Sequence, residues 1–278
     1  MAVEKLSKAL TIYDENGFWQ LVSRTYRHLR YLIRTHVLFR YYSLRGSWPV
    51  RIGDSSYSLT TPSTAEMTEI TYCTRNEAWI LDAIEDELQS GDVFWDVGAN
   101  IGIYSLLAGT NSADVSVVSF EPYPPNAASL RRNLDYNDIS ATVVEKALGD
   151  TRGTIGFDIT SEEGVDGSAA VDSGAESPCE VVPGDSLVHD DGIAPPDVLK
   201  IDVEGAELDV LDGLAETLSS GNCRTIYCEV HLSSSDRPSI EDFGGSFDEL
   251  KRTLRTHGYE LSITDRDNEK HVLARRSQ

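Results

Sequence analysis

From residue 93 onward, apolar runs of strand length alternate with segments of helical periodicity, and this rhythm limits the fold more than any other feature. The expected strands cover 93–97, 115–120, 141–145, 198–203 and 225–230, with two more near 259–263 and 271–274. The expected helices cover 102–109, 125–136, 206–219 and 247–256. Alternating strands and helices of this kind predict an α/β chain with a mostly parallel, doubly wound sheet.

The residues before this region predict two smaller parts. Residues 1–51 form an expected basic helical extension, because apolar positions within 18–44 recur at three- and four-residue steps. Residues 52–74 belong to a stretch of short strands, expected at 50–52, 57–59 and 70–72, and a helix is expected at 77–88. The predicted organisation is therefore 1–51, 52–74 and a doubly wound α/β domain over 75–278.

Two inserted segments interrupt the alternation of strands and helices. Residues 161–178 are rich in Ser, Gly, Asp and Glu, which predicts a solvated loop. Residues 233–246 follow the carboxyl end of a predicted strand, where loops of α/β proteins border the ligand crevice. These two loops are the expected source of any substrate specificity.

Charge is high and unevenly distributed. The chain carries 24 Lys and Arg against 46 Asp and Glu, a formal net charge of −22. Residues 1–51 hold nine of the basic and three of the acidic residues, which leaves a strong excess of acid in the remainder. An acidic surface repels phosphates and excludes nucleic-acid binding by most of the molecule. Acid-rich surfaces with few lysines are typical of proteins that work in a high-salt cytoplasm, where salt screens the repulsion.

The basic segment 18–44 presents two different helix faces. Its apolar face carries Val22, Tyr26, Leu29, Ile33 and Val37, and its arginines at 24, 27, 30 and 34 recur on another face. A basic amphipathic helix binds anionic membrane surfaces or partner proteins. The same helix can also pack on its own acidic domain or form a dimer contact, so membrane association and self-association both stay open.

The sequence predicts a cytoplasmic protein, with the inner membrane surface as its location if the basic helix binds lipid. The most apolar early stretch, 31–42, is interrupted by Arg34 and Arg40, which is too short for a membrane span. No uninterrupted apolar segment of a signal peptide follows the first eight residues. The four cysteines include no Cys-x-x-Cys pair, which favours reduced thiols.

The segment Asp96–Gly102 (DVGANIG) follows a predicted strand and precedes a helix. Its glycines let a ligand approach the backbone, and the helix start offers unpaired N–H groups. The acid at position 96 is a poor neighbour for a pyrophosphate and a good one for an ammonium or sulfonium group. This segment therefore favours a cationic ligand over a dinucleotide.

Glu121 closes the next predicted strand. An acid at this place accepts hydrogen bonds from ribose hydroxyls in nucleotide-binding α/β folds. Together, Asp96 and Glu121 fit an adenosine with a positively charged amino-acid tail, which describes S-adenosylmethionine. A strand-end carboxylate that is simply solvated is the alternative for Glu121.

These segments resemble the FkbM family of S-adenosylmethionine-dependent methyltransferases. The resemblance covers roughly 75–275 and is carried by Asp96–Gly102, Phe120–Pro122, Ala147–Asp150, Lys200–Glu207 (KIDVEGAE) and Glu229–His231. It implies a Rossmann-like class I methyltransferase fold with seven strands, and O-methylation of hydroxyls on sugars, glycans or related natural products. The basic residues 1–51 lie outside it, and 161–178 match it poorly.

The resemblance also implies roles for individual residues. Asp96, Gly98, Asn100 and Gly102 would surround the methionine part of the cofactor, and Glu121 would hold the ribose. The turn containing Ala147 and Leu148 would border the adenine.

The candidate catalytic residues follow the fourth strand. Lys200, Asp202 and Glu204 alternate, so a regular strand would send them to one side. Neighbouring carboxylates raise the pKa of one of the pair and can create a general base. Alternatively, Asp202 and Glu204 cap the helix that follows.

A second candidate group ends the fifth strand. His231 and Glu229 point to a common side and form either a base with its orienting acid or a hydrogen-bonded structural pair. Asp202 and Glu229 are also candidate ligands of a divalent metal that would acidify the acceptor.

Other functions compete with the methyltransferase hypothesis. An NAD-dependent oxidoreductase would also use Glu121, but the sequence lacks GxGxxG. A nucleic-acid methyltransferase would favour a Pro-Pro-aromatic platform where this chain has Asp-Val-Glu-Gly at 202–205. A non-catalytic membrane-surface or assembly module on a degenerate scaffold would place the function in the basic helix.

Overall fold

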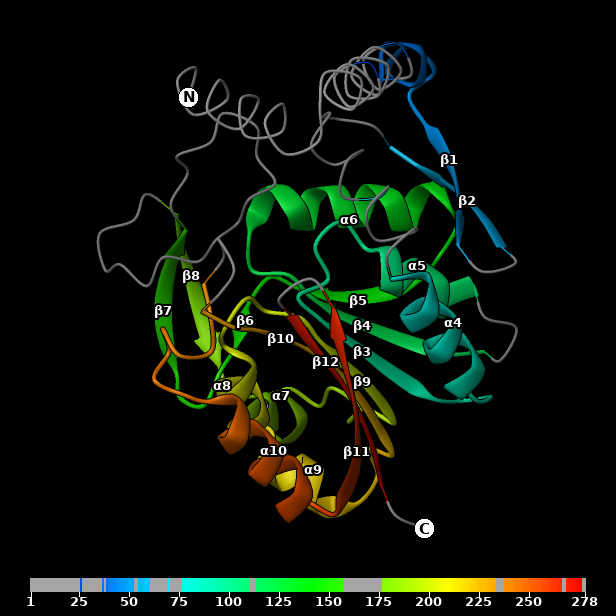
Figure 1. The fold of residues 1–278 in the computed structure, drawn as a ribbon. Helices are drawn as coiled ribbons and strands as arrows, with labels where there is room; N and C mark the ends of the chain where they lie inside the picture. Colours follow the sequence, from blue (N-terminus) through cyan, green and yellow to red (C-terminus); the bar gives the residue numbers. More distant parts are fainter. Residues whose placement is uncertain are drawn as a thin grey trace.

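A seven-stranded sheet forms the centre of the computed structural model, which describes residues 26, 37, 39–52, 55–60, 70, 77–110, 114–157, 177–233, 238–266 and 269–276 (Figure 1). Its order is β11-β12-β10-β9-β3-β4-β5. The bounds are β3 Val93–Val97, β4 Ser116–Phe120, β5 Ala141–Val144, β9 Val198–Ile201, β10 Thr225–His231, β11 Tyr259–Arg266 and β12 Glu269–Arg276. The predicted doubly wound α/β fold is confirmed.

The directions of the strands determine which residues meet at one edge of the sheet. Strands β3, β4, β5, β9 and β10 are parallel to their neighbours among these five, whereas β12 is antiparallel to both β10 and β11. The amino end of β12 therefore lies beside the carboxyl end of β10, at the same edge of the sheet as the carboxyl ends of β9, β3 and β4. We call this edge the carboxyl edge.

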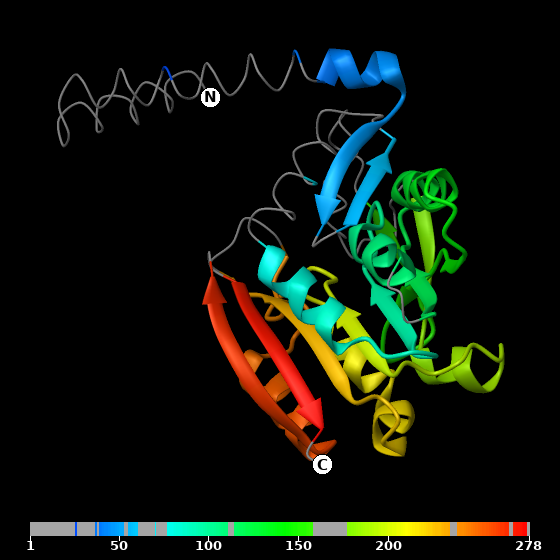
Figure 2. The ribbon, with the colours of Figure 1, turned by 90° about the vertical axis from the view of Figure 1, so that its right-hand side faces the viewer.

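Helices cover both faces of the sheet (Figure 1). One face carries α4 (Ala78–Glu87), α5 (Ile103–Thr110) and α6 (Pro124–Tyr136). The other face carries α7 (Gly184–His189), α8 (Glu207–Asp212), α9 (Ala215–Ser220) and α10 (Phe247–Thr256). Figure 2 shows the same layers from the side.

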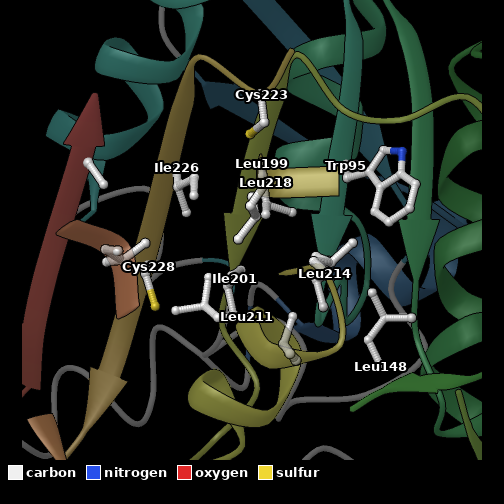
Figure 3. Close-up of a cluster of buried hydrophobic side chains, with 14 of the residues drawn as sticks. Trp95, Leu148, Leu199, Ile201, Leu211, Leu214, Leu218, Cys223, Ile226 and Cys228 are labelled. Atoms are coloured by element: carbon white, nitrogen blue, oxygen red, sulfur yellow. The ribbon is translucent and has the colours of Figure 1, made fainter. Parts of the chain in front are cut away.

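Two apolar clusters fill the spaces between the sheet and its helices. Neighbouring residues on a strand point to opposite faces, so Phe94 packs under α4 and α5 while Trp95 packs on the other side. The second cluster contains Leu199, Ile201 and Leu214 with Trp95 (Figure 3). Both central strands β3 and β9 are thus buried on both faces, as expected for a parallel sheet.

Specific contacts explain where one predicted helix begins and where another is interrupted. α10 occupies 247–256 as predicted, because the Ser246 hydroxyl accepts a hydrogen bond from the Glu249 backbone N–H at 3.3 Å. The helix predicted over 206–219 is instead split into α8 and α9. Gly213 lies at the break, and a Cβ atom there would overlap the Gly149 carbonyl oxygen.

Further strands lie outside the main sheet. β1 (Trp48–Ile52) and β2 (Ser55–Leu59) form an antiparallel pair that confirms the strands expected at 50–52 and 57–59, and the predicted boundary at 51 falls inside β1. β6 (Ala147–Leu148), β7 (Gly153–Phe157) and β8 (Ser177–Val182) form a small sheet that the sequence did not predict. The strand expected at 70–72 is wrong at Ile70, which is helical; 71 and 72 lie outside the described residues.

The basic amino-terminal segment is described only in part. Tyr26, Val37 and residues 39–45 are helical, and Tyr26 and Leu44 are 63% and 89% exposed. Most of its predicted apolar face, and the arginines from 24 to 34, lie outside the described residues. Among the helices of the described part, none has the length and apolar character that a membrane crossing requires.

Candidate functional site

The loop between β3 and α5 is shaped by contacts within the protein. Gly98 and Gly102 have φ values of 78° and 94°. A Cβ atom at Gly98 would overlap the Asp202 carbonyl oxygen, and one at Gly102 would overlap the Leu130 side chain. The glycines therefore admit the β9 loop and helix α6. Their approach to a ligand stays a prediction.

Glu121 and Asn100 form the rim of this loop. The Glu121 carboxylate accepts hydrogen bonds from the Asn100 N–H at 2.8 Å and the Tyr123 N–H at 2.9 Å. Burial raises the pKa of Glu121 to about 7, although these two hydrogen bonds lower it. Asn100 has a left-handed backbone at φ 49°, and its buried Oδ1 makes no hydrogen bond to the described residues.

Asp96 is fully buried beneath the same loop. Its Oδ2 accepts a hydrogen bond from the Ser105 hydroxyl at 2.6 Å, and Ser105 is 2.7 Å from the Ser119 hydroxyl. Its Oδ1 lies 3.6 Å from the Lys200 Nζ and has no hydrogen-bond donor in the part of the chain described. Burial raises the pKa of Asp96, and the ammonium of Lys200 opposes that rise.

Lys200 joins the two loops electrostatically. Its Nζ lies 3.1 Å from Asp202 Oδ2, 3.3 Å from the Gly98 carbonyl oxygen and 4.6 Å from the centre of the Tyr104 ring. Burial lowers the pKa of Lys200, but the charges of Asp202 and Asp96 outweigh burial and raise it overall. The raised pKa and the two neighbouring carboxylates favour the ammonium form of Lys200.

The segment after β9 leaves the strand geometry at once. Lys200 and Asp202 share a side as predicted, but β9 ends at Ile201, and Glu204 and Gly205 have φ values of 49° and 102°. The Asp202 side chain is 27% exposed, compared with 6% for Lys200 and 0% for His231. Of Lys200 and Asp202, Asp202 is therefore the side chain that faces the carboxyl edge.

His231 is fully buried and is held by Glu207, a residue that was not among the predicted site residues. Its Nδ1 lies 3.2 Å from Glu207 Oε1, which also accepts the Gly205 N–H at 2.8 Å. Glu207 is the last residue of the KIDVEGAE segment, so the resemblance contained the signal. The N-cap residue of α8 is Ala206, whose side chain makes no capping hydrogen bond.

Two further residues reach the site from β12. His271 lies opposite Glu229, and Glu269 lies opposite His231 in the antiparallel ladder. Burial and the nearby charge of Asp202 raise the pKa of Glu229 well above its usual value. Potential metal-ligating atoms come within 4.8 Å of one another in the set Asp202, Glu229, His231 and in the set Glu229, Glu269, His271.

The two residues predicted beside the adenine lie in the small sheet. Ala147 and Leu148 form β6, which pairs with β8. The Leu148 side chain is buried with Trp95 and Val182 in the second apolar cluster (Figure 3). Any contact of Leu148 with a ligand would therefore come from its backbone.

Comparison with known proteins gives one family. Residues 96–261 match the model of the methyltransferase FkbM domain. Hexuronic acid methyltransferase AglP of Haloferax volcanii is 31% identical over 157 residues, which cover 56% of this chain and 63% of AglP, less than two thirds of that relative. 31-O-demethyl-FK506 methyltransferase FkbM of Streptomyces tacrolimicus is 31% identical over 204 residues, covering 62% of this chain and 74% of the relative.

Solved structures match with low sequence identity. Precorrin-6y C5,15-methyltransferase from Geobacter metallireducens aligns with a TM-score of 0.47 and 16% identity, covering 73% of this chain and 90% of that chain.

Proposed function

Since the chain belongs to the FkbM family of methyltransferases, we propose that it moves a methyl group from S-adenosylmethionine to a hydroxyl of a sugar, glycan or related small molecule. The observation that carries this proposal is the carboxyl edge itself. Buried acceptors at Asp96, Asn100 and Glu121 lie beside the Lys200–Asp202 pair. When bound, the cofactor supplies an electrophilic methyl group on a sulfonium ion.

The acceptor atoms fit that cofactor. Each Glu121 oxygen accepts one backbone N–H, which leaves acceptor capacity for the two ribose hydroxyls. The Oδ1 atoms of Asp96 and Asn100 are buried acceptors without a hydrogen-bond donor among the described residues, which suits a cationic ammonium or sulfonium ligand. Gly98 and Gly102 would shape this cradle, and the backbone of Ala147 and Leu148 would border the adenine.

The acceptor hydroxyl would meet the segment after β9. Asp202 is the candidate general base, because it is the exposed partner of the pair and Lys200 retains its proton. Lys200 would hold Asp202 in place, with Glu204 beside it. His231 would serve as a positioning residue that contacts Glu207 and Glu229, because its ring is fully buried. Alignment of the oxygen, methyl and sulfur atoms would provide most of the rate enhancement.

The proposed acceptor class comes from the relatives. The name of AglP specifies hexuronic acid, and that of the Streptomyces relative specifies demethyl-FK506. A sugar or glycan that carries a free hydroxyl is the first class to test, with uronic acids foremost.

Binding of S-adenosylhomocysteine tests the cofactor half of this proposal. Titration calorimetry in concentrated KCl is expected to detect S-adenosylhomocysteine and not NAD. Asn100→Gly keeps the left-handed backbone at φ 49° and removes the buried Oδ1, so it should weaken binding about tenfold. Asp114→Gly is the matched control, because Asp114 also has a positive φ of 58° and lies before β4.

Methyl transfer to panels of sugars, uronic acids and macrolide alcohols, followed by S-adenosylhomocysteine release, tests the acceptor half. Binding of NAD alone by the folded protein would overturn the proposed cofactor. Transfer to none of the hydroxyl acceptors, with cofactor binding intact, would overturn the proposed acceptor class.

A further inference from the structure

Two Glu-x-His sequences face each other across neighbouring strands at the carboxyl edge. Glu229 and His231 end β10, and Glu269 and His271 begin β12. In the antiparallel register, Glu229 lies opposite His271 and His231 lies opposite Glu269. Residues two apart on a strand project from the same face. All four side chains therefore meet on one patch, with acid and imidazole at alternate corners.

The distances on this patch suit a shared ion. His231 Nε2 lies 3.8 Å from Glu229 Oε1 and 3.8 Å from Glu269 Oε1, and His271 Nδ1 lies 3.7 Å from Glu229 Oε2. These contacts are too long for direct hydrogen bonds. Two ligands that share a first-row metal ion at about 2.1 Å lie about 3 to 4 Å apart.

The orientation of His231 makes one ring nitrogen available. Its Nδ1 is paired with Glu207, and its Nε2 makes no hydrogen bond to the described residues although the side chain is fully buried. A buried ring nitrogen without a partner is costly. Metal-ligating histidines typically donate their second N–H to a carboxylate, which is the place that Glu207 occupies.

The charges of these four side chains also favour a bound divalent cation. Glu229 and Glu269 lie beside each other with side chains 9% and 13% exposed, and each is near an imidazole. Two carboxylates and two neutral imidazoles balance one divalent cation. Asp202 also comes near Glu229 and His231, but its Oδ2 is 3.1 Å from the Lys200 ammonium, which already compensates its charge.

We infer that Glu229, Glu269, His231 and His271 bind one divalent first-row cation. Mixed nitrogen and oxygen ligands favour ions of the Mn²⁺ or Zn²⁺ type over Mg²⁺ and Ca²⁺, which prefer oxygen. A cavity lined by Glu229, His271 and Lys200 borders two of these four residues. If the proposed function holds, an ion here would polarise the acceptor hydroxyl beside Asp202.

Metal titration tests the inference without an activity assay. The full chain, freed of metal and kept in concentrated KCl, is titrated with Mn²⁺ and separately with Zn²⁺ by calorimetry. One saturable ion per chain is expected for at least one of the two metals. Glu269→Gln should weaken its affinity at least tenfold, because one of two charged ligands is lost.

Glu216→Gln is the matched control, because Glu216 pairs with His189 at 3.1 Å on the surface. It should leave the binding unchanged. Circular dichroism and S-adenosylhomocysteine titration of each variant confirm folding. Absence of saturable binding of both metals, or equal affinity in Glu269→Gln, would overturn the inference. Cofactor binding that persists without any metal binding would refute the ion site alone and leave the proposed function standing.

Discussion

Glu121 gives the cofactor site a dependence on pH. Its pKa is raised to about 7, chiefly by burial, so the carboxyl group is partly protonated near neutrality. Protonation removes an acceptor for the ribose hydroxyls. The affinity for S-adenosylhomocysteine is therefore expected to fall by up to about fivefold between pH 7 and pH 6, and to level off above pH 8.

Calorimetry across this range checks the prediction, and Asn100→Gly should keep the same profile at lower affinity. An affinity that stays constant from pH 8 to pH 6 would contradict it. The effect on stability has the opposite sign. The folded protein binds the Glu121 proton more tightly than the unfolded chain, so the stability from this group is lost as the pH rises from 4.5 to about 7.

The sequence identified several of these groups because parallel strands bring their carboxyl ends together. Asp96 lies near the carboxyl end of β3, and Glu121 and Asp202 directly follow β4 and β9, so the structure places them around one edge. Glu269 and His271 were missed, because only the antiparallel register of β12 brings them opposite β10. The contact of Lys200 with Asp96 was also not predictable, since it depends on which strands are neighbours.

At the opposite edge of the sheet, one arginine joins three elements. Arg224 Nη1 donates to Asp92 Oδ1 at 2.9 Å and Nη2 donates to the Glu87 carbonyl oxygen at 2.7 Å. Nη2 also contacts the second Asp92 oxygen. Arg224 precedes β10, Asp92 precedes β3 and Glu87 ends α4. The guanidinium group therefore connects two strands of the sheet to helix α4.

Replacement of this arginine is expected to destabilise the fold. Arg224→Lys loses the paired hydrogen bonds and should lower the free energy of unfolding by about 1 to 3 kcal/mol. Arg131→Lys is the control, because Arg131 and Glu145 form a 2.7 Å ion pair that is about half exposed. This substitution should lower the free energy of unfolding by no more than about 0.5 kcal/mol. Urea unfolding of both variants measures the difference, and equal values would contradict the prediction.

The ends of a helix or strand could be predicted where the sequence of that segment alone determines them. The capping box at Ser246 sets the start of α10, and the apolar run of β3 matches its prediction at both ends. The strands β7 and β8 escaped prediction, because they pair across a long polar insertion. The break between α8 and α9 depends on the contact of Gly213 with Gly149, which no local pattern reveals.

The net charge of −22 determines how the whole molecule responds to salt. Like charges on the acidic surface repel one another in the folded state, and dissolved salt screens this repulsion over about 3 Å at 1 M. The midpoint of thermal unfolding is therefore expected to rise by at least about 5 °C between 0.1 M and 2 M KCl. Scanning calorimetry measures it, with sucrose of equal osmolality as a control. A midpoint that falls with added KCl would refute the prediction.

Gly98 has a consequence beyond its own turn. The space where its side chain would be is filled by the Asp202 carbonyl oxygen, so the loop after β3 rests directly on the loop after β9. Because of this close contact, we expect a shift of either loop to move the other. A ligand that stiffens the first loop then changes the energy of placing a ligand on the second. Linkage makes that influence reciprocal, so the two substrates of a transfer reaction at this edge would each alter the other's affinity by the same factor.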